Sequence, residues 1–344
     1  MSFLVAKSKR RMSPQFLIFN VFPLLSLALT LAHTRHIITI TAPNLQPTSL
    51  AWDPKSQHFL LASRFHPNIS SISDAGIVQT VLSSDGSSVN AIAIDSPRRT
   101  LLAALSNPAS IAAYDLRSPR PHTLIFSSPL PAAPSGLAVD EATGAVFATV
   151  GNFIYKIDPE GNSSIFSEFN SVLGGVVHVS RGFLLVAQPS TGMVYKVDDE
   201  TGRGKSVLGK GLGLGLGLVL RSDGSALMGG DDKVRVVRSE DGWGEAVVVD
   251  EVLVDKGVLM GLVVRDGRKV YVLVGENGDD DDGDDVDGGF LGRKFRIEEV
   301  DLVGKDGGDD MILAMVLLGF GLAYFLYWRF QMGKLASSLN KKRA

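Results

Sequence analysis

A weak motif returns six times along this chain at nearly constant spacing, and this repeat limits the possible fold more than any other feature. Each copy has a small residue, a short apolar run and a turn that contains Asp, Arg or Ser. The steps between copies are 42, 45, 39, 42 and 44 residues, by subtraction of the first residue numbers, which are Thr48, Asn90, Ser135, Gly174, Leu216 and Met260. A period of about 40–50 residues built from short strands is typical of a propeller blade. The sequence therefore predicts an all-β, six-bladed β-propeller.

The repeat also predicts where a functional site would lie. A propeller brings the start of every innermost strand to the mouth of one central channel. The six repeat starts are therefore the candidate channel-mouth residues. We expect the propeller to span 36–303, and we expect the strand at 36–41 to pair with the last blade. That pairing would close the ring and remove exposed sheet edges.

Composition excludes several classes of function. The net charge is −3 and no basic stripe interrupts the repeats, so the sequence predicts no nucleic-acid partner. The absence of cysteine excludes disulfides, thiol catalysis and cysteine-ligated zinc. His178 is the one histidine expected on an innermost strand, and a lone histidine there is more often structural than catalytic. Asp53, Asp95 and Asp140 recur at strand ends, which favours a turn-capping role.

Both ends of the chain carry membrane-related signals. Residues 1–32 combine a basic region with an apolar stretch, which predicts a signal peptide or, alternatively, an uncleaved signal anchor. Residues 311–328 contain no charge and are long enough to cross a bilayer as a helix. We therefore expect a C-terminal transmembrane helix that contacts membrane lipid.

The charges around 311–328 predict an orientation. Two aspartates precede the segment, whereas the tail at 329–344 has basic residues and no acidic ones. The positive-inside rule then places the tail in the cytosol and the propeller in the lumen, as in a single-pass type I protein. Lys341 and Lys342, fourth and third from the end, resemble a dilysine retrieval signal. This predicts the endoplasmic reticulum and coat-protein recognition; an ordinary basic cluster is the alternative.

Two further features belong to surface chemistry. Asn68 and Asn162 each begin an Asn-x-Ser pattern, which predicts N-glycosylation in a lumenal domain. The segment 279–287 holds seven aspartates and is expected to be a solvated acidic loop. Weak calcium binding by this loop is the functional alternative, although its spacing does not match an EF-hand.

Several short segments, in their order along the chain, resemble a known group. They include LAWDP at Leu50–Pro54, SISDAG at Ser71–Gly76, AYDLR at Ala113–Arg117 and DGWGE at Asp241–Glu245. The chain resembles the senescence marker protein, gluconolactonase and strictosidine synthase group, and in particular plant membrane proteins described as calcium-dependent phosphotriesterase-like. The resemblance implies a six-bladed propeller with one calcium ion in the channel, held by a Glu, one or more Asn and an Asp. Such an ion polarises an ester or lactone carbonyl and activates water.

The residues at the implied ligand positions depart from that pattern. Thr48 stands where the Glu is expected, Ser135 and Gly174 where Asn is expected, and Leu216 where the Asp is expected. Only Asn90 is an amide, and no carboxylate remains to offset the charge of calcium. We therefore predict a non-catalytic or degenerate lactonase-like protein that has no cofactor and binds a lumenal ligand or protein. The alternative is a calcium-dependent ester, lactone or phosphotriester hydrolase.

Overall fold

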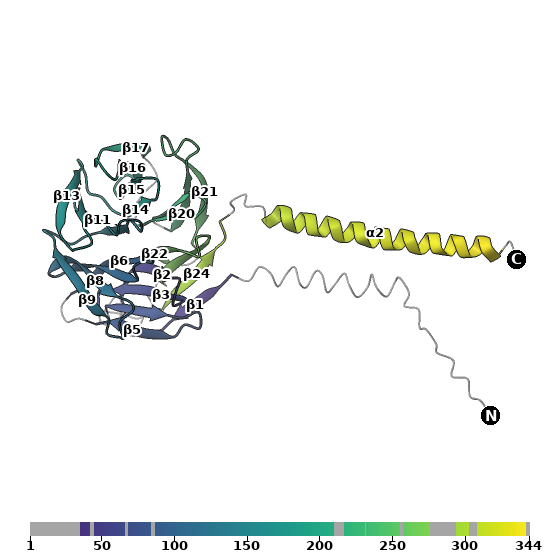
Figure 1. Ribbon diagram of the computed structural model, residues 1–344, viewed down its shortest axis with the longest axis horizontal. Coiled ribbons are helices and arrows are strands. Elements are labelled where there is room, and N and C mark those ends of the chain that lie inside the picture. Colours follow the sequence, from purple (N-terminus) through teal and green to yellow (C-terminus); the bar gives the residue numbers. More distant parts are fainter. Residues whose placement is uncertain are drawn as a thin grey trace, which may run out of the picture. The chain divides into compact units, whose positions relative to one another are not determined.

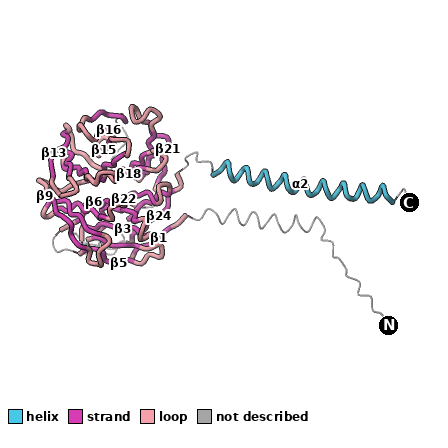
Figure 2. The backbone as a smooth tube through the Cα atoms, viewed as in Figure 1, coloured by secondary structure: helices cyan, strands magenta, loops and turns pink. Residues whose placement is uncertain are grey.

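The computed structural model describes residues 35–41, 45–65, 68–83, 87–209, 217–230, 232–254, 257–275, 294–302 and 308–341. The chain divides into two units. One unit is Arg35–Leu302, and all the described strands belong to it. The other contains the two ends of the chain, and its described part is the helix α2 (Gly308–Lys341). Figure 2 shows this division as magenta strands in one unit and a cyan helix in the other.

The strands of Arg35–Leu302 form six four-stranded antiparallel sheets, and each sheet is one blade (Figure 1). Blade one is β2 (Pro47–Asp53), β3 (His58–Ser63), β4 (Ile69–Ile72) and β5 (Val78–Leu82). Blade two is β6 (Val89–Asp95), β7 (Thr100–Ser106), β8 (Ala109–Asp115) and β9 (Thr123–Pro129). Blade three is β10 (Gly136–Val139), β11 (Val146–Val150), β12 (Phe153–Ile157) and β13 (Ser163–Glu168).

The remaining blades repeat the pattern, and the last one closes the ring. Blade four is β14 (Val176–Val179), β15 (Phe183–Gln188), β16 (Met193–Asp198) and β17 (Gly204–Leu208). Blade five is β18 (Gly217–Leu220), β19 (Ala226–Gly230), β20 (Lys233–Arg238) and β21 (Val247–Leu253). Blade six is β22 (Val258–Arg265), β23 (Lys269–Gly275), β24 (Phe295–Val300) and, as its outer strand, β1 (Ile37–Ile40).

The closure by β1 confirms the pairing expected from the sequence. β1 pairs antiparallel with β24, with Ile38 opposite Ile297, and Figure 1 shows the two strands side by side. Because the first and last strands share one sheet, the ends of the propeller are held together by backbone hydrogen bonds. The six-bladed, all-β fold predicted from the repeat is therefore confirmed.

The hydrophobic core lies between neighbouring blades rather than in one central mass. The second strands of the blades are buried on both faces; every residue of β11 and of β15 is buried. This burial explains why these strands read as continuous apolar runs instead of alternating patterns. The innermost strands contact one another in the cyclic order β2, β6, β10, β14, β18 and β22, and so surround the centre.

The helix α2 contains the segment 311–328, so a helix forms where one was predicted. Several of its apolar side chains, including Leu317, Phe320 and Leu322, are exposed. Within the described residues, however, no helix meets the length and hydropathy needed to cross a bilayer. The transmembrane assignment of 311–328 therefore stays a prediction.

Candidate functional site

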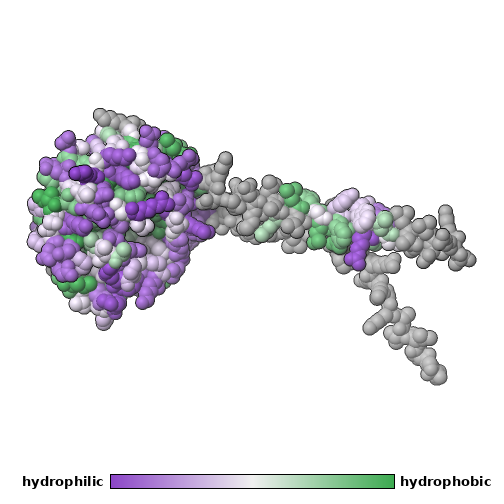
Figure 3. Space-filling view, turned by 45° about the horizontal axis from the view of Figure 1, so that its top comes forward, coloured by the Kyte–Doolittle hydropathy of each residue, from purple (hydrophilic) through white to green (hydrophobic). Residues whose placement is uncertain are grey.

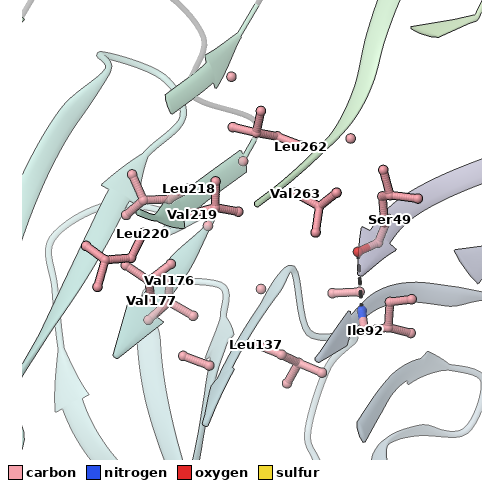
Figure 4. Close-up of a pocket in the computed structure, with 18 of the residues that line it drawn as sticks. Ser49, Ile92, Leu137, Val176, Val177, Leu218, Val219, Leu220, Leu262 and Val263 are labelled. Atoms are coloured by element: carbon pink, nitrogen blue, oxygen red, sulfur yellow. Dashed lines mark hydrogen bonds between the residues drawn. The ribbon is translucent and has the colours of Figure 1, made fainter. Parts of the chain in front are cut away.

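A cavity of about 420 Å³ lies at the centre of the propeller. All six innermost strands line it, and Figure 4 shows side chains from several of them around the same space. Since each innermost strand begins at one end of this channel, the residues before and at the strand starts form its mouth. The strand ends define the opposite face.

The structure brings most of the predicted channel-mouth residues together. Thr48, Asn90, Ser135 and Met260 all line the cavity. Gly174 lies beside it, immediately before the lining residue Gly175. Leu216 lies outside the described residues, and its neighbour Gly217 lines the cavity. The geometry thus places these positions at the mouth, while their equivalence to metal ligands stays a prediction.

The polar side chains at the mouth are engaged in hydrogen bonds to the next blade. The Thr48 hydroxyl of blade one donates to the Val89 carbonyl at the start of blade two. The Asn90 Nδ2 of blade two donates to the carbonyl of Pro134, before blade three, at 3.2 Å. The Ser135 hydroxyl lies 3.0 Å from the carbonyl of Leu173, before blade four. Three successive blade junctions are therefore joined in the same way.

The junction between blades three and four also brings two backbones into close approach. The Thr149 hydroxyl, on the second strand of blade three, donates to the Gly174 carbonyl at 2.7 Å and is buried. A Cβ atom added to Gly136 would lie 2.6 Å from that same carbonyl oxygen. Only glycine permits so close an approach of the two backbones. Gly174 is thus part of the channel wall, and its carbonyl accepts a hydrogen bond from Thr149 of blade three.

The residues at the mouth do not fit a calcium ion. Calcium takes six to eight oxygen ligands, usually with carboxylates among them. The described repeat-start positions offer two hydroxyl oxygens, from Thr48 and Ser135, and one amide oxygen, from Asn90, which are too few ligands and carry no negative charge. No cluster of three or more His, Asp or Glu side chains that could hold a metal is found among the described residues.

Below the mouth, the channel wall is aliphatic, and its ionisable residues lie toward the far end. Glu141 and His178 are the ionisable residues among those that line the cavity. His178 Nε2 lies 2.8 Å from Asp199 Oδ2, and its ring stacks on Phe147 with centroids 6.0 Å apart. Its Nδ1 lies 3.8 Å from Asp140 Oδ1. Through these contacts His178 joins blades three and four.

The strand ends on the opposite face carry the charges. As predicted, the aspartates there cap turns: Asp53 Oδ1 accepts from Lys55 N at 3.0 Å, and Asp140 Oδ1 accepts from Ala142 N at 2.9 Å. Asp53 also receives both terminal nitrogens of Arg99 from blade two, the second at 2.9 Å. Burial alone raises the pKa of Asp53, but the bonds from Arg99, Ser56 and Lys55 outweigh it and lower this pKa to about 2.

The two predicted glycosylation sites differ in accessibility. Asn68 is only 3 % exposed, and its amide donates to the carbonyl of Ser87. Asn162 is exposed on a turn, where its Nδ2 donates to Asp158 Oδ2 at 2.8 Å. A glycan on Asn68 is incompatible with this buried position, whereas Asn162 has room for one. The segments 1–32 and 279–287, Lys342 and the side chain of Lys341 lie outside the described residues.

Comparisons with known proteins support the fold. The Malassezia sympodialis allergen Mala s 1 has a TM-score of 0.60 and 12% identity, over 78% of this chain and 97% of that one. Virginiamycin B lyase from Staphylococcus aureus has a TM-score of 0.55 and 12% identity, over 77% of this chain and 100% of that one. The WD40 repeats of RRP9 have a TM-score of 0.57 and 14% identity, over 78% and 97%.

These similarities are too distant in sequence to carry an activity across. No protein-family profile and no curated protein matches the chain. The plant lactonase-like group is therefore a resemblance of short motifs only, and what the comparisons show is the propeller fold itself.

Proposed function

We propose that this chain is a membrane-anchored, lumen-facing propeller that binds a ligand or partner and does not catalyse a metal-dependent reaction. The observation that carries the proposal is the use of the mouth side chains. Thr48, Asn90 and Ser135 are tied to neighbouring blades where the resembled enzymes hold an ion. These bonds fix the three side chains in the wall, and no carboxylate stands at the described mouth positions to offset the charge of a calcium ion.

Metal analysis of the purified chain, paired with ester and lactone assays, tests this proposal. We expect no stoichiometric calcium and no metal-dependent hydrolysis. A variant lacking 279–287 controls for loose cation binding by the acidic segment. The combined change Thr48→Glu, Ser135→Asn, Gly174→Asn and Leu216→Asp is expected to create measurable metal affinity if the alignment with the enzymes holds. One calcium bound tightly by the unmodified chain, with or without 279–287, would instead favour the hydrolase alternative.

The membrane part of the proposal rests on the charge-free segment 311–328 and the basic tail. The direction of the last blade fixes the face on which the propeller strands end. β24 runs parallel to β22, since both pair antiparallel with β23, so β24 ends on the face opposite the mouth. β1 is antiparallel to β24 and begins on that same face. The chain therefore reaches Leu302, the last described residue of the propeller, on the face opposite the channel mouth.

Glycan mapping and localisation test the membrane orientation. We expect a glycan on Asn162 and none on a sequon added after Arg343, because that tail would stay in the cytosol. Replacing Lys341 and Lys342 by Ser is expected to release the protein from the endoplasmic reticulum, since receptor recognition of the signal needs both lysines. A glycosylated tail would contradict the orientation, and unchanged localisation of the double variant would contradict the retrieval signal.

A further inference from the structure

The channel below the mouth is walled by aliphatic side chains from five different blades. The partly exposed members are Ile94, Leu137, Val139, Val177, Val219, Leu220 and Val264. They lie on innermost strands and line the cavity, so the exposed part of each faces the channel; Figure 4 shows Leu137, Val177 and Val219 around it. By contrast, the outer face in Figure 3 is largely hydrophilic, with scattered apolar residues. Removing this internal aliphatic surface from water is favourable for a guest of matching chemistry.

The described mouth presents no charge to such a guest. The lining residues at that end that carry polar side chains are Thr48, Ser49, Asn90 and Ser135, all neutral. The ionisable lining residues, Glu141 and His178, lie toward the far end. A charged head group at the mouth would lose hydration without meeting an opposite charge, which is unfavourable. The geometry therefore disfavours both carboxylates and ammonium groups there.

Two polar groups at the mouth keep hydrogen-bonding capacity. Asn90 uses its Nδ2 on Pro134, and its Oδ1 has no partner among the described residues. Ser49 Oγ accepts from Ile92 N at 3.3 Å, the dashed line in Figure 4, and its own hydrogen has no acceptor among the described residues. One acceptor and one donor therefore remain among the neutral groups at the mouth. A hydroxyl group both donates and accepts, so it can bond to either of them.

We propose that the channel binds a neutral amphipathic molecule with an aliphatic or alicyclic body and a hydroxyl group. The body would lie against the aliphatic wall, and the hydroxyl would bond to Asn90 or to Ser49 at the mouth. The cavity of about 420 Å³ lies within the roughly 300–1,000 Å³ typical of small-molecule sites. This inference rests on the proposed binding function and names the chemical class of its ligand.

Three probes with one body and different heads test the proposal: 1-octanol, octanoate and octylammonium. The full-length chain in lipid nanodiscs is melted with each probe, and unfolding is followed by the fluorescence of Trp52 and Trp243, which are buried in the propeller. A ligand that binds only the folded state raises the melting temperature in proportion to its affinity. We expect 1-octanol to give the largest increase and both charged probes to give little.

Variants separate the channel from partition of the probes into lipid. Val264→Thr keeps the side-chain shape but places a hydroxyl in the aliphatic wall, and we expect octanol affinity to fall about tenfold. Val247→Thr is the matched control, because Val247 is 61 % exposed on the outer strand β21. Val177→Thr repeats the test if Val264→Thr does not fold. Asn90→Asp supplies a charge at the mouth and is expected to make octylammonium the preferred probe.

The outcomes distinguish this inference from the function on which it rests. If no probe shifts the melting temperature, or a charged probe binds the unmodified chain best, the ligand class is wrong while a binding role through the outer surface stands. Equal effects of Val264→Thr and Val247→Thr would also overturn it, since binding would then lie outside the channel. Calcium-dependent hydrolysis of octyl acetate would overturn the proposed function itself.

Discussion

The channel mouth and the opposite face of the propeller join neighbouring blades by different chemistry. At the mouth, neutral side chains such as Thr48 and Ser135 bond to backbone carbonyls of the next blade. On the opposite face the bonds are ionic: Arg99 of blade two holds Asp53 of blade one, and Arg265 of blade six holds Asp74 of blade one. The junction between blades one and two is thus fastened by a neutral group at the mouth and by a charged pair at the opposite face.

This difference bears on function because of where charge is placed. Asp53 has two roles on the opposite face: its carboxylate caps its own turn and also accepts hydrogen bonds from the Arg99 guanidinium. The charges of Asp53 and Arg99 are thus paired with each other, and neither residue lines the cavity. The mouth, where an ion would be held in a metal-dependent propeller, is built from groups that need no ion. Neutral bonds at three junctions of the mouth, and charged pairs at the turns of the opposite face, together favour a channel for a neutral guest.

The largest expected effect comes from breaking the charged junction. Arg99→Met leaves the carboxylate of Asp53 without its partner, and the Asp53 side chain is only 4 % exposed. Removing one partner of such a buried pair is expected to lower the free energy of unfolding by about 3 kcal/mol. Denaturant unfolding followed by the fluorescence of Trp52 and Trp243 measures this loss.

A second pair on the same face serves as the control. Arg117 is 66 % exposed and holds Asp115 within one turn, so Arg117→Met is expected to change stability little. Equal losses for Arg99→Met and Arg117→Met would mean that burial does not decide how much an ion pair contributes to the free energy of unfolding. The junction of Arg99 with Asp53 would then not differ from an exposed pair.

The next largest effect is expected from Gly136→Ala, which tests how closely blades three and four approach each other at the mouth. Gly136→Ala would place its Cβ 2.6 Å from the Gly174 carbonyl oxygen, so one backbone must shift. We expect a loss of about 2–3 kcal/mol, as for overpacking of a site that relaxes poorly. Gly217→Ala is the matched control, because a Cβ at Gly217 on the first strand of blade five meets nothing within 4 Å. Thermal melts of both variants suffice; equal melting temperatures would show that the junction is loose.

The charged junction also predicts a pH dependence. The pKa of Asp53 is lowered from 3.8 to about 2 in the folded chain. A lowered folded-state pKa adds stability at pH values above the unfolded value, and this stability is lost as the pH falls through the folded value. Asp53 should thus contribute about 2 kcal/mol that disappears between about pH 4 and pH 2. The difference between unfolding curves of the unmodified chain and Arg99→Met isolates this term, and parallel losses in both would argue against it.

The sequence predicted the six blades and the closure by β1 because repeats fix the position of each innermost strand. The same periodicity led from Thr48, Asn90, Ser135 and Met260 to one cavity. The periodicity did not reveal that Thr149 lies near the mouth. Thr149 is on β11 and lies there because it pairs with Gly136 on the adjacent strand β10. The hydrophobic pattern and the turn fix the register of the two strands, but nothing in the motif marks the residue opposite Gly136 as part of the mouth.

Two further features are visible only in the folded structure. The pair of Arg99 with Asp53 joins residues 46 positions apart, and neither belongs to a motif that marks the other. Asn68 satisfies a glycosylation pattern, but it is buried by the packing of blade one. A three-residue pattern does not indicate whether its asparagine is buried. The aliphatic channel wall was likewise hidden, because apolar residues on an inner strand read equally well as core.

The smallest effect is the one that bears most directly on the mouth. Thr48→Val keeps the shape of the side chain but removes the hydroxyl that donates to the Val89 carbonyl. We expect a loss of about 1 kcal/mol in the free energy of unfolding, the usual value for one such bond. Thr80→Val, on the outer strand β5 where Thr80 is exposed, is the control and should change little. Calcium content and ester hydrolysis are measured on the same samples, and neither should change. Unaltered stability together with lost hydrolysis would instead move Thr48 from the channel wall to an active site, and the neutral mouth would then be a catalytic one.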